Sequence, residues 1–207
     1  MDWLPDIWIE VFGVITGIAF VFLEIKQNNW LWPVGIVTSA VYILVFFTGK
    51  LYADMSLQGY YLVISIIGWY WWLKGSKVQR YEGAEVRYDE AGVNSSNGKS
   101  LKVSRISTKI TLVLLFVFVT LYSVMYFILS RFTDSPVPAA DSFVTSLSIV
   151  ATWMLARKIY EHWYLWIIVN SVSCVLFLTR GLYATVILYA VYFTMSFVGL
   201  REWKRSF

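Results

Sequence analysis

Apolar residues fall into seven long stretches along the chain, and short polar or helix-breaking segments separate them. The stretches cover residues 8–25, 31–49, 56–73, 109–130, 141–156, 163–179 and 182–200. A helix needs roughly 17–25 mostly apolar residues to cross a bilayer. The pattern therefore predicts an all-α integral membrane protein with seven transmembrane helices.

The sequence also matches itself without a gap when it is displaced by 131 positions. Trp32 then falls on Trp163, Gly68 on Gly199, and Leu51-Tyr52-Ala53 on Leu182-Tyr183-Ala184. Ser and Thr interrupt the fifth stretch, but the match pairs it with the first stretch. This pairing supports the assignment of the fifth stretch as a helix. Duplicated membrane helices are typical of transporters that hold their substrate between the two copies.

The fourth stretch, 109–130, has no counterpart in this repeat. Three crossings bring the chain to the opposite side of the membrane, and one extra crossing returns it, so both triplets of helices point the same way. The expected architecture is a SWEET-like 3+1+3 arrangement with two parallel three-helix repeats. Its parts are a first repeat over 1–73, a loop over 74–108, a linker helix over 109–131 and a second repeat with a short tail over 132–207.

Composition and charge agree with a membrane location. The chain is 58% apolar and 14% charged, and its mean hydropathy is +0.63, whereas about a quarter of the residues in soluble domains are charged. Of its 17 Lys and Arg residues, all but Lys50, Arg131 and Arg180 lie on the predicted side of the C-terminus and the 74–108 loop. The positive-inside rule therefore places that side in the cytoplasm and the N-terminus outside. Topology explains the basic charge, so no nucleic-acid partner is expected.

The 74–108 loop mixes charges of both signs with Gly, Ser and Asn, which predicts a flexible cytoplasmic tether. Its segment Gly92 to Ser100 resembles a phosphate-binding loop, but five residues stand between the first Gly and Gly98-Lys99-Ser100 where the motif has four. No strand or apolar helix flanks it. ATP binding is therefore not expected, and neither is any other cofactor.

The sixth stretch carries the main candidate site. Trp163, Trp166 and Asn170 stand at i, i+3 and i+7, so one helix face presents all three. Trp163 alone also fits an aromatic belt at the membrane surface, but Asn170 lies two turns deeper, where a buried amide needs partners. Two indoles followed by an amide suit a flat aromatic ligand with a polar edge, and the rings also attract a cation.

The first half carries a weaker version of this face, because the residues 131 positions earlier are Trp32, Gly35 and Ser39. The predicted substrate site includes Trp32 but leans toward the second half.

Four further residues complete the predicted site. Gln58 and Tyr61 stand at i, i+3 in the third stretch, and Tyr189 and Tyr192 stand at the equivalent positions of the seventh. A polar residue in an apolar helix can bind substrate, although helix–helix packing also explains such residues.

The ionisable residues give no catalytic or metal site. Glu24 and Asp54 lie at the predicted ends of helices, where we expect them to reach water. His162 has Glu161 beside it but no second His or Cys nearby, which makes a poor metal site. An integral-membrane enzyme would need facing ionisable groups inside the bundle, and a purely structural protein would not explain Gln58 and Asn170. No enzyme activity is expected.

Several of these segments resemble the PnuC family of vitamin transporters, and the resemblance spans nearly all of the predicted membrane portion. The run from Trp163 through Trp166 to Asn170 is similar to the WxxWxxxN signature of that family. The other similar segments are Leu51-Tyr52-Ala53 with Gln58, Gly68-Trp69-Tyr70-Trp71-Trp72, Trp153-Met154-Leu155-Ala156-Arg157-Lys158, and Gly181-Leu182-Tyr183-Ala184 with Gly199 and Trp203.

The resemblance implies a seven-helix SWEET-like fold in the bacterial cytoplasmic membrane and vitamin uptake by facilitated diffusion with alternating access. A cytoplasmic kinase would then trap the vitamin by phosphorylation. It also implies substrate-binding roles for Trp163, Trp166, Asn170 and Gln58. Nicotinamide riboside and thiamine both remain open as substrates, because both carry a cationic aromatic ring. The carboxamide of nicotinamide riboside matches Asn170 more closely. The sequence leaves homo-oligomer formation open.

Overall fold

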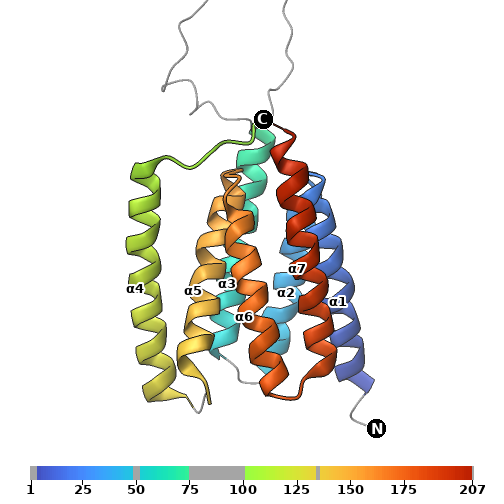
Figure 1. Cartoon of the computed structure of the whole chain (residues 1–207). Helices are drawn as coiled ribbons and strands as arrows, with labels where there is room; N and C mark the ends of the chain where they lie inside the picture. Colours follow the sequence, from blue (N-terminus) through green and yellow to red (C-terminus); the bar gives the residue numbers. More distant parts are fainter. Residues whose placement is uncertain (1–3, 49–51, 75–100, 134–135, 207) are drawn as a thin grey trace, which may run out of the picture.

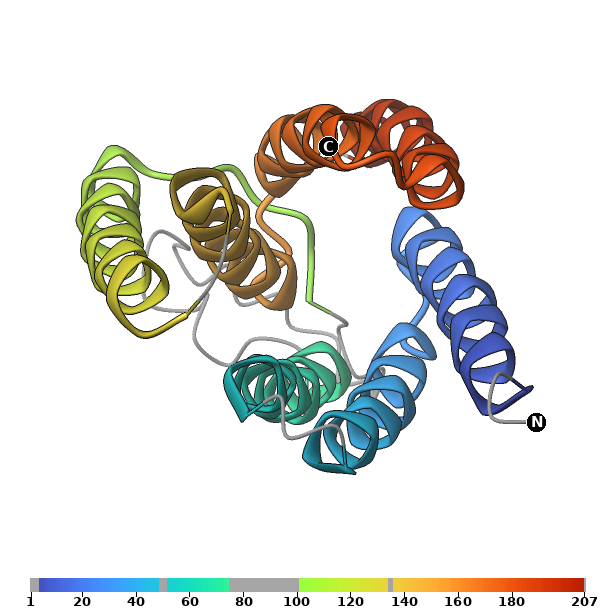
Figure 2. The same ribbon diagram turned by 90° about the horizontal axis from the view of Figure 1, so that it is seen from below.

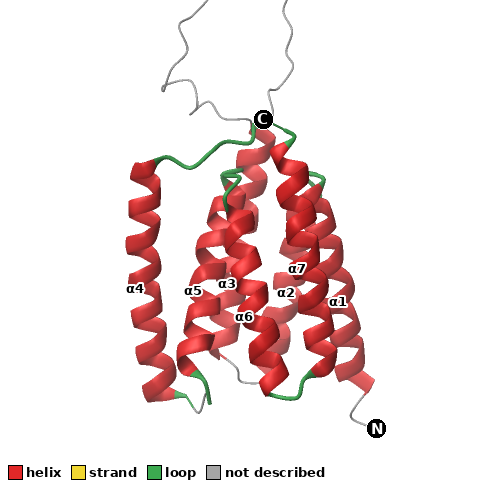
Figure 3. Cartoon of the chain, in the orientation of Figure 1, coloured by secondary structure: helices red, strands yellow, loops and turns green. Residues whose placement is uncertain are grey.

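The computed structural model describes residues 4–48, 52–74, 101–133 and 136–206, and its elements in these ranges are seven α-helices (Figures 1 and 3). The helices are α1 (Leu4–Ile25), α2 (Leu31–Thr48), α3 (Tyr52–Lys74), α4 (Thr108–Phe132), α5 (Pro138–Ala156), α6 (His162–Thr179) and α7 (Tyr183–Lys204). The prediction of an all-α chain with seven helices is confirmed. Helices α1, α3 and α5 begin about one turn before the apolar pattern does, because hydropathy marks the apolar part of a helix rather than its first hydrogen-bonded turn.

Four of these helices are long and apolar enough to cross a membrane by length and composition alone, namely α2, α4, α5 and α6. In α1, the apolar stretch Val11–Ile25 is shorter. Helices α3 and α7 carry charged residues at their ends, including Lys74 on α3 and Arg201 and Lys204 on α7.

Six helices form a closed ring, seen end-on in Figure 2. Following the contacts between helices, its order is α1, α2, α3, α5, α6 and α7, and α7 packs back against α1. Helix α4 lies outside the ring and packs against α5. None of the residues of α4, all of which the structure describes, is buried. An apolar helix exposed on so much of its surface is suited to contact with lipid.

Local chemistry explains several helix ends. The Ser107 side chain accepts a hydrogen bond from the Ile110 N–H at 3.4 Å and caps α4. Pro138 begins α5, a position where its missing N–H leaves no hydrogen bond unmade. The turns before α2 and α6 share a backbone feature, because Gln27 (φ 51°) and Lys158 (φ 50°) both adopt the left-handed conformation. These two residues are 131 positions apart.

The apolar core lies at the end of the ring that holds the C-terminus (Figure 1), and four fully buried tryptophans dominate it. Trp32 and Trp72 meet edge-to-face with ring centroids 5.4 Å apart. Their counterparts in the second half, Trp163 and Trp203, meet edge-to-face at 5.8 Å. Edge-to-face pairing is a favoured arrangement of aromatic rings.

Two glycines make room for these rings. Gly68 lies against the Trp32 ring and Gly199 lies against the Trp163 ring, so closely that an added Cβ would overlap the indole in each case. Glycine is required here for close approach rather than for backbone conformation.

The prediction of a flexible tether over 74–108 needs correction at its end. Ser104 donates its N–H to the Lys158 carbonyl at 3.0 Å and accepts from the Tyr160 N–H at 2.9 Å. The Ile106 N–H donates to Glu161 Oε2 at 2.9 Å. These bonds fix residues 101–107 against the turn between α5 and α6, a long-range pairing that composition does not reveal. Residues 75–100, including the segment from Gly92 to Ser100, lie outside the described residues.

Candidate functional site

A cavity of about 920 Å³ lies inside the ring, and all six ring helices contribute side chains to it. At one end its lining includes the exposed residues Gly181, Leu182 and Tyr183, between α6 and the start of α7. At the other end its lining includes Glu24 and Trp163, which are 2% and 1% exposed. The cavity is therefore open at the end of the α6–α7 turn and closed at the end of the tryptophan core. Its volume is in the range of small-molecule sites.

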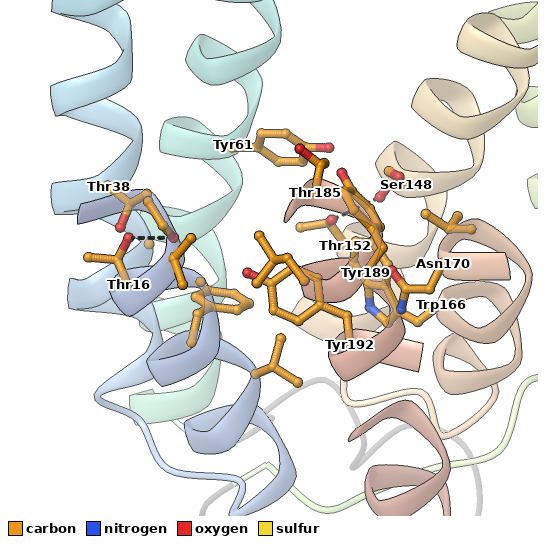
Figure 4. Close-up of a pocket in the computed structure, with 18 of the residues that line it drawn as sticks. Thr16, Thr38, Tyr61, Ser148, Thr152, Trp166, Asn170, Thr185, Tyr189 and Tyr192 are labelled. Atoms are coloured by element: carbon orange, nitrogen blue, oxygen red, sulfur yellow. Dashed lines mark hydrogen bonds between the residues drawn. The ribbon is translucent and has the colours of Figure 1, made fainter. Parts of the chain in front are cut away.

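Helix α6 forms a polar and aromatic wall of this cavity with Trp166 and Asn170 (Figure 4). Asn170 is buried, and its Nδ2 donates to Ser196 Oγ on α7 at 3.1 Å. Ser196 Oγ in turn donates to the Tyr192 carbonyl at 2.8 Å. This chain of hydrogen bonds holds the Asn170 amide in one orientation. The buried Trp166 Nε1–H has no acceptor among the described residues.

Tyrosines from α3 and α7 extend this wall, since Tyr61, Tyr189 and Tyr192 line the cavity together with Gln58. The rings of Tyr189 and Tyr192 meet edge-to-face at 5.8 Å. The Tyr192 hydroxyl reaches the neighbouring helix α1 at Gly17, where an added Cβ would overlap it. The structure thus brings residues of the third, sixth and seventh helices together.

The opposite wall comes from α1 and α2, where Thr16 and Thr38 face the cavity (Figure 4). Each hydroxyl donates to a carbonyl of its own helix, Thr16 to Phe12 at 2.8 Å and Thr38 to Val34 at 2.8 Å. The oxygen lone pairs remain available to a ligand. Sequence reasoning missed both residues, because a threonine that bonds to its own helix is common in membrane helices. The available signal for Thr16 was its place between Gly13 and Gly17, two glycines that also line the cavity.

The two tryptophans at the closed end differ from Trp166. Trp163 borders the cavity but packs mainly against Gly199 and Trp203. Trp32, also predicted as a site residue, does not line the cavity and is wholly enclosed by the core. Both form the floor beneath the cavity rather than its side walls.

Glu24 was expected to reach water, and the structure shows the opposite. Its side chain is buried at the closed end of the cavity, and its Oε1 lies 3.0 Å from Nε2 of the equally buried His162. Trp203 Nε1 donates to the Glu24 backbone carbonyl at 3.0 Å. Position near a helix end shows how deep a residue lies in the membrane, but not whether another helix covers it. Here α6 and α7 cover Glu24.

The turn between α5 and α6 adds a third buried ionisable group at this end. Lys158 is 5% exposed, and its Nζ lies 4.1 Å from the centroid of the Trp72 ring. Burial lowers the pKa of the Lys158 ammonium to about 8, since desolvation disfavours the charged form. The ring face compensates part of that cost.

The arrangement is that of a binding chamber. Among the described residues, no group of three or more His, Cys, Asp or Glu side chains could hold a metal ion. The wall of α6 and α7 offers a large aromatic surface with one fixed amide. The wall of α1 and α2 offers two hydroxyl groups. A ligand with a flat ring at one side and hydroxyl groups at the other would satisfy both walls.

Comparison with known proteins places the chain among vitamin transporters. The family profile described as Nicotinamide mononucleotide transporter matches residues 7–205. The nicotinamide riboside transporter PnuC of Escherichia coli (strain K12) is 28% identical over 209 residues, with 96% of this chain and 86% of that protein covered. The riboflavin/roseoflavin transporter RibM of Streptomyces davaonensis is 23% identical over 197 residues, with 95% and 84% covered.

A solved structure shares the fold. The crystal structure of the vitamin B3 transporter PnuC superposes with a TM-score of 0.70 at 23% sequence identity, over 98% of this chain and 83% of that one. At this level of identity the likeness shows the architecture of the helices and not the ligand.

Proposed function

The chain belongs to the nicotinamide mononucleotide transporter family, the PnuC family of membrane vitamin transporters, and on that premise we propose that it carries nicotinamide riboside across the bacterial cytoplasmic membrane. The observation that supports this substrate most directly is the cavity wall formed by Trp166 and Asn170. An indole face stacks on a pyridinium ring and attracts its positive charge. The carbonyl oxygen of Asn170 accepts from the ligand's carboxamide N–H, while Ser196 fixes the amide.

The remaining polar groups suit the other half of this ligand. Thr16 and Thr38 stand across the cavity from Trp166 (Figure 4), at the place where the ribose would lie. Tyr61, Tyr189, Tyr192 and Gln58 close the sides between the two walls. In this proposal Trp163 and Trp32 support the site from below, and only Trp163 comes within reach of the ligand.

Transport in this proposal is facilitated diffusion by alternating access. The cavity is accessible at one end and sealed by the tryptophan core at the other, as one state of such a cycle requires. The positive-inside rule assigns the sealed end to the cytoplasm and the α6–α7 turn to the outside. A cytoplasmic kinase would make uptake one-way by phosphorylating the vitamin. Whether copies of the chain assemble does not enter this mechanism.

The helices are proposed to form two parallel repeats, α1–α3 and α5–α7, with α4 as the linker. Three features support this arrangement. The ring order places α3 beside α5 and α7 beside α1. Gln27 and Lys158 share an unusual backbone conformation. Trp32 on Gly68 matches Trp163 on Gly199. A pseudo-two-fold axis along the membrane normal relates such halves.

Thiamine is the alternative substrate. It offers a cationic ring to Trp166 and an aminopyrimidine edge to Asn170, but it has no ribose hydroxyls for Thr16 and Thr38. The relatives compared above give it no support, since they are transporters of nicotinamide riboside and of riboflavin.

Uptake into proteoliposomes tests the proposal. Purified protein is reconstituted, and labelled nicotinamide riboside and labelled thiamine are supplied in parallel vesicles without ATP or an ion gradient. We expect nicotinamide riboside to equilibrate and thiamine to stay near the level of protein-free vesicles. If thiamine equilibrates and nicotinamide riboside does not, thiamine is the substrate. If neither label enters, the transporter mechanism is wrong for both.

A further inference from the structure

The contact between Glu24 and His162 contains a proton whose presence follows from geometry. His162 Nδ1 lies 2.6 Å from the Ile159 carbonyl oxygen, which can only accept, so Nδ1 carries a hydrogen. Nε2 faces Glu24 Oε1 at 3.0 Å. A hydrogen bond there needs one further proton, either on the imidazole as a charged pair or on the carboxyl as a neutral pair. Without that proton, an imidazole lone pair would face a buried carboxylate.

Within the part of the chain that the structure describes, no second cation shares this buried contact. The side chains of α2 and α3 that pack at this end are apolar or aromatic, among them Leu31, Trp32 and Trp72. In the turn before α6, Lys158 lies on the Trp72 ring and Glu161 accepts from the Ile106 N–H. Directly after α1, Lys26 is exposed. At the end of α7, Arg201 and Lys204 are exposed, and Glu202 pairs with Arg205. His162 is thus the ionic partner of Glu24.

The equivalent positions in the other half hold no ionisable group. The residue 131 positions after Glu24 is Leu155, and the residue 131 positions before His162 is Leu31. Both leucines are fully buried in the same core cluster. The scaffold therefore packs at this place without a charge, and replacing a buried ion pair with apolar residues is often neutral or stabilising. Packing alone does not explain why the α1–α6 contact is ionisable.

The contact also sits where the cavity must open. It joins the end of α1 to the start of α6, and Glu24 lines the cavity. Trp203 on α7 also donates a hydrogen bond to this last turn of α1, at the Glu24 carbonyl. Resting on the alternating-access mechanism above, we propose that Glu24 and His162 form a proton-binding site in the cavity floor, and that at neutral and higher pH the cytoplasmic end opens with release of this proton. The proton leaves to cytoplasmic water as the two side chains separate, and one returns when the contact re-forms.

Linkage gives the pH dependence of opening. In water an imidazole titrates near pH ~6.5 and a carboxyl near ~4.3. Above pH ~6.5 the separated groups therefore hold one proton fewer than the closed contact, and opening becomes more favourable by up to about tenfold per pH unit. Between those two values the open and closed states hold the same number of protons. Opening should then be insensitive to pH.

The test measures initial nicotinamide riboside exchange in proteoliposomes with the same pH on both sides, from 6 to 8, so that protein orientation does not matter. We expect the wild-type rate to rise at least threefold from pH 7 to 8. Glu24→Gln keeps the contact, because its amide donates to a neutral imidazole, but it holds no exchangeable acid proton. Its rate should therefore lack the wild-type rise between pH 7 and 8.

A second variant keeps the proposal testable if Glu24→Gln does not fold. Glu24→Leu/His162→Leu copies the other half and leaves no buried group unpaired, and its rate should not depend on pH in this range. Glu202→Gln removes an exposed carboxylate from the same end of the molecule and should keep the wild-type rise. A flat wild-type profile, or one profile shared by the wild type and the double variant, would overturn the proposal.

A readout without substrate separates this inference from the proposed function. Opening exposes the four core tryptophans, so acrylamide quenching of their fluorescence should increase from pH 7 to 8 in the wild type and not in the double variant. If that difference appears while no vitamin is exchanged at any pH, the proposed function fails and the proton site stands. If quenching is equally insensitive to pH in both proteins, the proton site is wrong.

Discussion

Helices α1–α3 and helices α5–α7 carry the same packing at the closed end of the cavity, with Trp32 against Gly68 in one half and Trp163 against Gly199 in the other. They differ at the cavity itself. Where α6 has Trp166 and Asn170, α2 has Gly35 and Ser39 at the positions 131 residues earlier. The buried leucines Leu31 and Leu155 likewise correspond to His162 and Glu24 at the same offset. At these positions the residues that pack rings against backbone are the same in both halves, and the residues that offer polar groups differ.

The largest expected effect comes from breaking the ionisable contact on one side only. Glu24→Ala leaves His162 buried without its partner, which we expect to destabilise the protein by about 3–5 kcal/mol. Glu24→Leu/His162→Leu, which makes this contact like that of Leu31 and Leu155, should recover most of the loss. Thermal unfolding in detergent, followed by size exclusion, measures both. A double variant as unstable as Glu24→Ala would show that the two contacts are not equivalent.

The next effect concerns the glycine–tryptophan packing that the two halves share. Gly68→Ala and Gly199→Ala each push a Cβ into a buried indole, and such overpacking costs about 1–3 kcal/mol. Because the two sites have the same geometry, their losses in unfolding temperature should agree closely. Gly59→Ala is a matched control, since an added Cβ there meets no atom within 4 Å. A large loss for one tryptophan-facing glycine and none for the other would contradict the equivalence.

The third effect concerns the residues at which the two halves differ in the proposed ligand site. Trp166→Ala should weaken nicotinamide riboside binding by about 10- to 100-fold, the loss of a stacking interaction of about 1–3 kcal/mol. Asn170→Ser, which copies the first half, should cost about tenfold by losing one hydrogen bond to a charged ligand. Titration calorimetry on purified protein measures these affinities.

Ser39→Ala supplies the comparison in the first half. It removes the counterpart of Asn170 and should change the affinity by less than about threefold. All three proteins should express and purify like the wild type. Equal losses from Ser39→Ala and Asn170→Ser would mean that the site does not lean toward the second half.

The smallest effect concerns the turn where Lys158 replaces the Gln27 of the first half. In the folded protein this ammonium loses its proton near pH 8, whereas in the unfolded chain it keeps the proton to about 10.5. Above pH 8 the unfolded chain therefore binds more protons at this residue, and the contribution of Lys158 to stability rises with pH. From pH 7 to 8.5 we expect the stability of the wild type relative to that of Lys158→Gln to rise by less than about 1 kcal/mol. Melting curves of both proteins at several pH values measure this difference, in which the pH dependence of Glu24 and His162 cancels, and a difference that stays constant with pH would contradict the prediction.

Much of the fold was predictable from the order of the residues. Apolar stretches of membrane-spanning length predicted all seven helices, because a helix must satisfy its own backbone hydrogen bonds in lipid. The i, i+3, i+7 spacing of Trp163, Trp166 and Asn170 predicted a shared face, and all three border one cavity. The roles of these residues in binding stay predictions until a ligand is measured.

Other features depended on contacts between distant segments. Trp32 has the sequence surroundings of Trp163, yet only Trp163 reaches the cavity. Thr16 and Thr38 became candidates only when α1 and α2 were seen opposite α6. Residues 101–107 read as part of a tether, and they pair with the turn at 158–161.

Glu24 shows why some features could be predicted from the sequence and others could not. The sequence by itself determined that the residue ends an apolar helix, because helix length and hydropathy are local properties that set depth along the membrane. Only the tertiary structure decided that His162, 138 positions away, lies 3.0 Å from it under the cover of α6 and α7. Burial depends on which helix faces cover a side chain, and a covered carboxyl group must share a proton or pair with a charge.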